Sequence, residues 1–247
     1  MFDVIAIQLR CLTPMAFIPC FLAIVLTGCN SSKAETNYPL QSDVCDYFDK
    51  SEELLNFQLW ESLPDTKSAY LRLPEEYFLP YRRGRYRNTT LDGAVHFQIR
   101  EADFGPVSRQ FERYALKTNP RPKMLVLLSH RVNLTALYNN FFYGEVGNYK
   151  LDQNLPTNED RFGLISAGKG ISHYETYVNL SNNQITDLIL CGRPELIISE
   201  AKNENCQHHI TYKNIGVQFT YDSELLKNWS LYRQRIMKFM SCMSQEK

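Results

Sequence analysis

The side chains best suited to chemistry in this sequence are cysteines and histidines, and at one place they lie close enough to suggest a metal site. Cys206, His208 and His209 fall within four consecutive residues. A thiolate and imidazoles can bind zinc, provided that further ligands converge on the same point. A disulfide at Cys206 would remove the thiolate, so we expect no metal and no cofactor here.

Motifs that mark common enzyme sites do not occur in the sequence. It contains no Gly-x-Ser-x-Gly, no His-Glu-x-x-His and no phosphate-binding glycine loop. The other histidines, His96, His130 and His173, are scattered along the chain. With Asp103 they are the residues on which an unfamiliar hydrolase site would depend. We expect that the protein is not an enzyme.

A different kind of chemistry is expected at Cys29. The uncharged apolar run Met15–Leu26 ends in the tetrad Leu26-Thr27-Gly28-Cys29, and the run is shorter than the roughly 20 residues of a membrane span. The tetrad resembles the bacterial lipobox, in which the cysteine thiol takes a diacylglycerol, a peptidase cleaves before it and the freed amine is acylated. It predicts a signal peptide over residues 1–28 and lipidation of Cys29. The alternatives are a plain cleaved signal peptide and an N-terminal anchor helix.

The segment after the signal peptide is expected to tether a folded domain to the membrane. Asn30 stands where inner-membrane lipoproteins carry aspartate, so the lipobox resemblance implies the periplasmic face of the outer membrane. Residues 29–42 are polar and aperiodic, as in flexible linkers. Hydrophobic residues make up 44% of the chain and charged residues 22%, which is typical of a folded domain. The net charge of zero gives no bulk attraction to nucleic acid.

Four cysteines remain for the folded domain once Cys11 and Cys20 leave with the signal peptide and Cys29 is lipidated. These four are Cys45, Cys191, Cys206 and Cys242. An even number in an oxidising periplasm suggests disulfides, and four cysteines allow three connectivities.

The hydrophobic pattern predicts an α+β fold, with antiparallel sheet and a long C-terminal amphipathic helix packed on one face. Residues 43–63 are mixed between helix and strand. Strands are expected over residues 68–73, 93–100, 124–129, 174–180, 185–191 and 210–221. A helix capped by Asp222 or Ser223 is expected to run to Met243, because its apolar residues recur every three or four positions. The sequence leaves open whether residues 43–150 and 151–247 form two similar subdomains.

Two basic segments are candidates for partner binding. Residues 81–87 contain four arginines and two tyrosines, which are residue types enriched at interface hot spots. The candidate contacts are Tyr81, Arg82, Arg83, Arg85, Tyr86 and Arg87. The alternative is a solvated loop whose arginines pair with carboxylates such as Glu75 and Glu76. The polar face of the C-terminal helix carries Lys227, Arg233, Arg235 and Lys238, which we interpret as an ordinary solvated face.

Short motifs in the mature chain resemble those of periplasmic, lipid-anchored immunity proteins associated with type VI secretion. The motifs are Leu71-Arg72-Leu73-Pro74-Glu75-Glu76-Tyr77, Asp103-Phe104-Gly105-Pro106, Phe162-Gly163-Leu164, Tyr174 to Tyr177, Ile185 to Cys191, Cys206-x-His208 and Val217-x-Phe219 leading to Leu226-x-x-Trp229. The segment between Arg87 and Gly93 and the second histidine, His209, depart from the family pattern.

The resemblance implies a periplasmic protein that binds and neutralises a toxic effector protein without catalysis. It also implies a disulfide between Cys191 and Cys206, which leaves Cys45 and Cys242 either as a second disulfide or as two buried thiols. The alternative function is a structural lipoprotein of the envelope or of a secretion apparatus.

Overall fold

The computed structural model describes residues 43–51, 53–60, 69–78, 90–92, 94–115, 122–130, 132–151, 155, 160–172, 174–192 and 205–244. Several predictions of the sequence analysis lie outside the described residues. They concern the signal peptide and lipidated Cys29, the tether, the basic segment 81–87 and His173.

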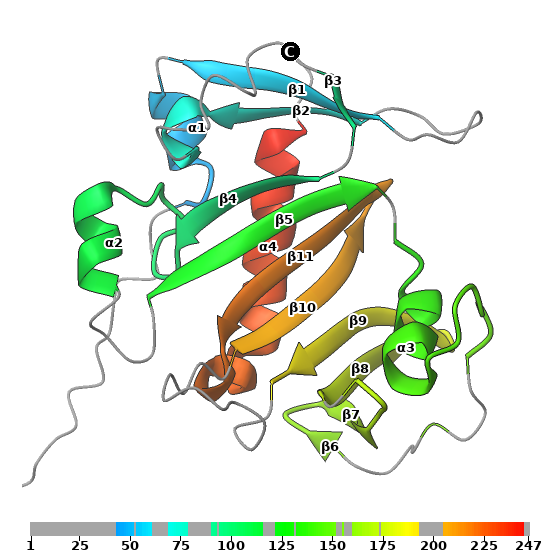
Figure 1. Ribbon diagram of the computed structural model, residues 1–247. Helices are drawn as coiled ribbons and strands as arrows, with labels where there is room; N and C mark the ends of the chain where they lie inside the picture. Colours follow the sequence, from blue (N-terminus) through cyan, green and yellow to red (C-terminus); the bar gives the residue numbers. More distant parts are fainter. Residues whose placement is uncertain are drawn as a thin grey trace, which may run out of the picture. The chain divides into compact units, whose positions relative to one another are not determined.

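The domain is built on an eight-stranded sheet in which every neighbouring pair of strands is antiparallel (Figure 1). The strand order is β4-β5-β11-β10-β9-β8-β7-β6. The strands are β4 (Val95–Arg100), β5 (Lys123–His130), β6 (Asp160–Arg161), β7 (Leu164–Lys169), β8 (Glu175–Ser181), β9 (Gln184–Cys191), β10 (Asn205–Tyr212) and β11 (Ile215–Asp222). The antiparallel α+β prediction is confirmed.

Alternating side chains explain why these segments form strands with two different faces. In β4, Val95, Phe97 and Ile99 are buried while the residues between them are half-exposed, which is the period-two pattern of a sheet edge packed on a core. The segment 210–221, predicted as one strand, is instead the end of β10, a turn and most of β11. Lys213 in that turn has φ +52°. The turn contains no glycine, so it was not recognised from the sequence.

The C-terminal helix α4 (Trp229–Met243) covers one face of this sheet, behind the strands in Figure 1. It follows a 3-10 turn, η4 (Ser223–Asn228), in which the Asp222 carboxylate accepts from the backbone N–H of Glu224. Ile236, Phe239 and Met240 are fully buried against the larger hydrophobic core. The predicted cap and amphipathic helix are therefore present, with the first turn wound as 3-10.

A small second sheet and several short helices complete the larger core. The sheet has the order β2-β1-β3, with β1 (Leu54–Trp60) antiparallel to β2 (Ala69–Pro74) and parallel to β3 (Thr90–Asp92). The short helices are α1 (Asp46–Lys50), η1 (Glu75–Tyr77) and α2 (Arg109–Ala115). In the described part of the mixed segment 43–63, a helix is thus followed by a strand.

Two disulfides hold the domain together. Cys45 at the start of α1 is bonded to Cys242 in α4, 197 residues further along the chain. Cys191 is bonded to Cys206, and the two residues face each other on the paired strands β9 and β10. The pairing that the resemblance implied is confirmed, and the open choice for Cys45 and Cys242 is settled as a second disulfide.

Helix α3 (Leu134–Tyr143) packs on the other face of the sheet, in front of β8 and β9 in Figure 1. It buries Leu134 and Tyr138 in a second, smaller core with Val178, Leu188 and Leu190. The division of the domain at residue 150 stays a prediction, although β5 from the first segment is hydrogen-bonded to β11 from the second. None of the helices in the described ranges is both long and apolar enough to cross a membrane.

Candidate functional site

A buried aspartate, Asp187, lies at the centre of the most polar part of the sheet. Its side chain is fully buried. Oδ1 accepts hydrogen bonds from His208 Nε2 at 3.0 Å and from Arg233 Nε at 2.8 Å. Oδ2 accepts from Asn179 Nδ2 and from Thr186 Oγ1, both at 2.9 Å. Burial alone would raise the pKa of Asp187, but its hydrogen bonds with His208 and Asn179 and the charge of Arg233 outweigh burial and lower it.

The neighbouring His208 is neutral, which makes Arg233 the counter-charge of Asp187. Burial lowers the pKa of His208, and this effect exceeds the opposing effect of Asp187. A neutral imidazole that donates from Nε2 to a carboxylate leaves Nδ1 as an acceptor. His208 Nδ1 is buried and has no hydrogen-bond partner among the described residues. The carboxylate of Asp187 is therefore balanced by a guanidinium that comes from α4.

The arginines of α4 correct the prediction of a solvated polar face. Arg233 is held by Asp187, and Arg235 donates to the backbone carbonyls of Glu101 and Ala102 at 3.1 and 2.7 Å. The guanidinium of Arg235 also lies 4.3 Å from the centre of the Phe104 ring. The prediction is wrong for these two arginines, because their partners come from strands and loops far away in the sequence.

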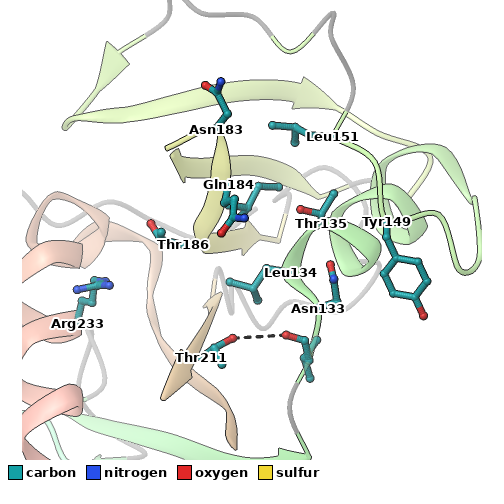
Figure 2. Close-up of a pocket in the computed structure, with 12 residues that line it drawn as sticks. Asn133, Leu134, Thr135, Tyr149, Leu151, Asn183, Gln184, Thr186, Thr211 and Arg233 are labelled. Atoms are coloured by element: carbon teal, nitrogen blue, oxygen red, sulfur yellow. Dashed lines mark hydrogen bonds between the residues drawn. The ribbon is translucent and has the colours of Figure 1, made fainter. Parts of the chain in front are cut away.

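A groove of about 630 Å³ opens beside this cluster (Figure 2). Its walls come from the segment leading into α3, the turn between β8 and β9, the end of β10 and one side chain of α4. The lining residues are Val132, Asn133, Leu134, Thr135, Tyr149, Leu151, Asn183, Gln184, Ile185, Thr186, Thr211 and Arg233. Arg233 is the one charged residue among them, and most of the others offer amide or hydroxyl groups.

Local hydrogen bonds fix the walls of the groove. Asn133 caps α3 by accepting from the backbone N–H of Ala136 at 3.0 Å, as expected for an N-cap asparagine. Thr211 Oγ1 donates to the carbonyl of Val132 at 3.4 Å, which is the dashed line in Figure 2. At the turn, Asn182 and Asn183 have φ values of +50° and +58°, a conformation that asparagine tolerates better than most residues. The turn therefore holds Asn183 and Gln184 at the rim.

Tyr149 lies at the opposite rim on a loop that a buried amide anchors. Its side chain is 65% exposed. Asn139 in α3 is buried, and its Nδ2 donates to the carbonyls of Asn148 and Lys150, both at 2.8 Å. These two hydrogen bonds flank Tyr149 on either side. The exposed tyrosine is thus presented on an ordered loop.

A smaller cavity of about 210 Å³ adjoins the groove and shares Val132 and Leu134 with it. It lies between α3 and the strands β10 and β11, and His209 is among its lining residues. Burial, with a smaller contribution from His208, lowers the pKa of His209 to about 4. Its Nε2 is buried without a hydrogen-bond partner in the described part of the chain. His209 is therefore neutral near pH 7.

Asp103 and His130, two of the residues considered for catalysis, lie apart in the structure, and Cys206 is not available as a metal ligand. Asp103 lies just after the last residue of β4, Arg100, which pairs with Lys123 at the start of β5. His130 is the last residue of β5 and therefore lies at the opposite end of this strand pair. Asp103 is bonded to Arg100 and Tyr47. Cys206 is in a disulfide, so it offers no thiolate. Across the described ranges, no three or more His, Cys, Asp or Glu side chains are placed to hold a metal ion.

Sequence reasoning missed the cluster that frames the groove. The available signal was Asp187 itself, a charged residue in the middle of the apolar run Ile185–Cys191. A buried carboxylate requires partners, but apart from the adjacent Thr186 its partners are 8, 21 and 46 residues away in the sequence. The spacing of residues along the chain could not identify them.

The observed architecture and site define a disulfide-bridged α+β domain with a polar groove on one face of its sheet. No protein-family model matches the chain, and no curated protein matches it.

Two solved structures show weak similarity to the chain. One is Smlt3025, an immunity protein of the type IV secretion system of Stenotrophomonas maltophilia, with 16% identity and a TM-score of 0.49, covering 72% of this chain and 90% of that one. The other is FrpD, the iron-regulated outer membrane lipoprotein of Neisseria meningitidis, with 9% identity and a TM-score of 0.37, covering 79% of this chain and 94% of that one. Neither similarity assigns a function to this chain.

Proposed function

We propose that this protein is a lipid-anchored periplasmic immunity protein that binds and neutralises a toxic effector delivered by type VI secretion, and that it does so without catalysis. The sequence motifs that resemble such immunity proteins support this proposal. The two disulfides also support it, because disulfides persist in oxidising compartments such as the periplasm.

The observation that carries the proposal is the groove beside α3. It is open and walled by hydrogen-bonded elements, and it presents an exposed tyrosine and a partly exposed arginine. Tyrosine and arginine are among the residues that most often dominate binding energy at protein interfaces. A rigid site loses little conformational entropy when its partner binds. The groove therefore suits tight binding of a protein.

Exposed apolar side chains extend this surface beyond the groove. Val146 is 86% exposed and Ile171 is 63% exposed. Both lie near the C-terminal end of α3, where a side chain added at Gly144 would come within 2.6 Å of Ile171 Cδ1. Clustered exposed apolar residues commonly mark interaction surfaces. Together with Tyr149 they form a surface that we assign to the effector.

Periplasmic co-expression tests the function directly. The product of the neighbouring gene is directed to the periplasm with and without the full chain of this protein. We expect growth arrest without it and growth with it. Absence of protection would contradict the immunity function, and loss of envelope assembly on deletion, without any toxin, would favour the structural lipoprotein instead.

The anchor is tested separately at Cys29. A Cys29→Ser variant should incorporate no labelled palmitate, whereas the unaltered chain should be labelled. Equal labelling of the two proteins would contradict lipidation at this residue.

A further inference from the structure

Among the described residues that line the groove, Arg233 carries the one charge. The side chain of Arg233 is 34% exposed, and Figure 2 shows it entering the groove from α4, across from Asn133 and Thr135. Its Nε is used by Asp187. The two terminal nitrogens have no hydrogen-bond partner among the residues that the structure describes. They are donors without an acceptor.

Asp187 does not provide that acceptor at the groove surface. Its carboxylate is fully buried, and four donors already occupy its two oxygens. The same network fixes the guanidinium by its Nε. A guanidinium held at Nε still offers its two terminal N–H groups in the parallel arrangement that matches the two oxygens of a carboxylate.

The remaining lining residues favour a single negative charge. Among the lining residues that the structure describes, none is acidic. Arg233 is also the one cation among those described residues, whereas surfaces that bind nucleic acid or other polyphosphates gather several. Asn183, Gln184 and Thr135 supply neutral hydrogen-bonding groups elsewhere in the lining of the groove. This chemistry fits a carboxylate and the polar backbone next to it.

We infer that the groove receives an aspartate or glutamate side chain of the protein partner, bound by the terminal nitrogens of Arg233. The inference rests on the proposed function, since it takes the partner to be a protein. Asp187 acts as a positioning residue, because it accepts from Arg233 Nε, and His208 fixes Asp187 through its own hydrogen bond to Oδ1. Tyr149 covers the opposite rim.

Model compounds test the chemistry of the groove independently of any effector. The ¹⁵N-labelled full-chain protein is titrated with N-acetylglutamate N-methylamide and with the uncharged N-acetylglutamine N-methylamide at constant ionic strength. We expect saturable shifts of the amide signals of Thr135, Asn183 and Gln184 with the glutamate compound, and affinity roughly tenfold lower for the glutamine compound. Equal affinity for both compounds, or no shift of these signals with either, would overturn the inference.

Charge variants at Gln184 provide a second measurement that leaves Arg233 intact. Gln184 is an exposed rim residue at the start of β9. Gln184→Glu should weaken binding of the glutamate compound and Gln184→Lys should strengthen it, each by about threefold at low salt. Asn56, an exposed amide residue on β1 in the other sheet, is the matched control, and Asn56→Asp and Asn56→Lys should leave the affinity unchanged. Equal effects at the two positions would contradict the inference.

The two proposals can fail separately. If co-expression gives protection but the groove does not prefer the glutamate compound, the immunity function stands and the acidic occupant is wrong. If the groove binds the glutamate compound as described but gives no protection, the site stands and the immunity function is wrong.

Discussion

The two faces of the eight-stranded sheet differ in what their side chains do. The α4 face is closed: Ile236, Phe239 and Met240 are fully buried there, and a disulfide ties the helix to the start of the domain. The α3 face has a smaller core, and beside that core lie a groove and a cavity with exposed aromatic and apolar residues at their edges. The difference fits the proposal above, in which one face provides stability and the other provides recognition.

The charged cluster connects these two faces. Arg233 belongs to α4, yet it lines the groove together with residues of α3 and the β8–β9 turn. Arg233 is hydrogen-bonded to the buried Asp187 and belongs to α4. The position of its guanidinium therefore depends on how the α4 face is packed. We infer that the stability of one face fixes the geometry of the other.

Removing the disulfide of the closed face should have the largest effect on stability. Cys45 and Cys242 close a loop across 197 residues of sequence. In the chain-entropy model such a loop contributes about 5 kcal/mol, against about 3 kcal/mol for the separation of 15 residues between Cys191 and Cys206. Urea unfolding of the Cys45→Ala/Cys242→Ala and Cys191→Ala/Cys206→Ala variants measures both. A smaller loss for the first variant would contradict the role assigned to the α4 face.

Removing the charge of Arg233 should have the next largest effect. Arg233→Gln leaves the buried Asp187 without its counter-charge, which we expect to cost about 3 kcal/mol of unfolding free energy after allowance for the exposed part of the arginine. The matched control is Lys238→Gln on the same helix, because Lys238 pairs at 2.7 Å with Asp43 and both side chains are about half exposed. That variant should lose less than about 1 kcal/mol. Similar losses in the two variants would contradict the expectation that the buried Asp187–Arg233 pair contributes more to stability than an exposed ion pair.

Acid should weaken the α3 face through His209. The pKa of this histidine is about 4 in the folded protein, below its ordinary value of 6.5. The unfolded chain therefore binds the proton first, and stability falls as the pH drops from about 6.5 towards 4. Between pH 7.5 and pH 5 the loss should be about 2 kcal/mol. Over the same change of pH, the His209→Gln variant should lose less unfolding free energy than the unaltered protein, and the difference should equal this amount. Equal losses in the two proteins would contradict a neutral buried His209.

Sequence patterns identified the elements whose signal is local. The alternation in β4 and the apolar spacing of α4 are repeated within single segments, so both could be predicted. The turn at Lys213 was missed because its left-handed residue is not glycine or asparagine. Residues 93–100 and 124–129 were predicted as strands, but only the structure shows that they join the same sheet as β11.

The candidate site was predictable only in part, because it depends on contacts between distant segments. Arg233 was assigned to a solvated face from its position on α4, and no local pattern connects it with Asp187, 46 residues earlier. Likewise, the exposed Tyr149 gains its place from Asn139, whose buried side chain binds the loop backbone. Segment 81–87, the candidate that the sequence favoured for partner binding, stays a prediction.

The central claim, that the α3 face carries recognition, is tested most directly with two tyrosines. Tyr149 at the groove is 65% exposed and Tyr70 on β2 is 69% exposed, so replacing either should leave the unfolding free energy nearly unchanged. In the periplasmic co-expression test we predict that Tyr149→Ala loses protection against the neighbouring gene product while Tyr70→Ala keeps it. Full protection by Tyr149→Ala, or equal loss in both variants, would contradict the account.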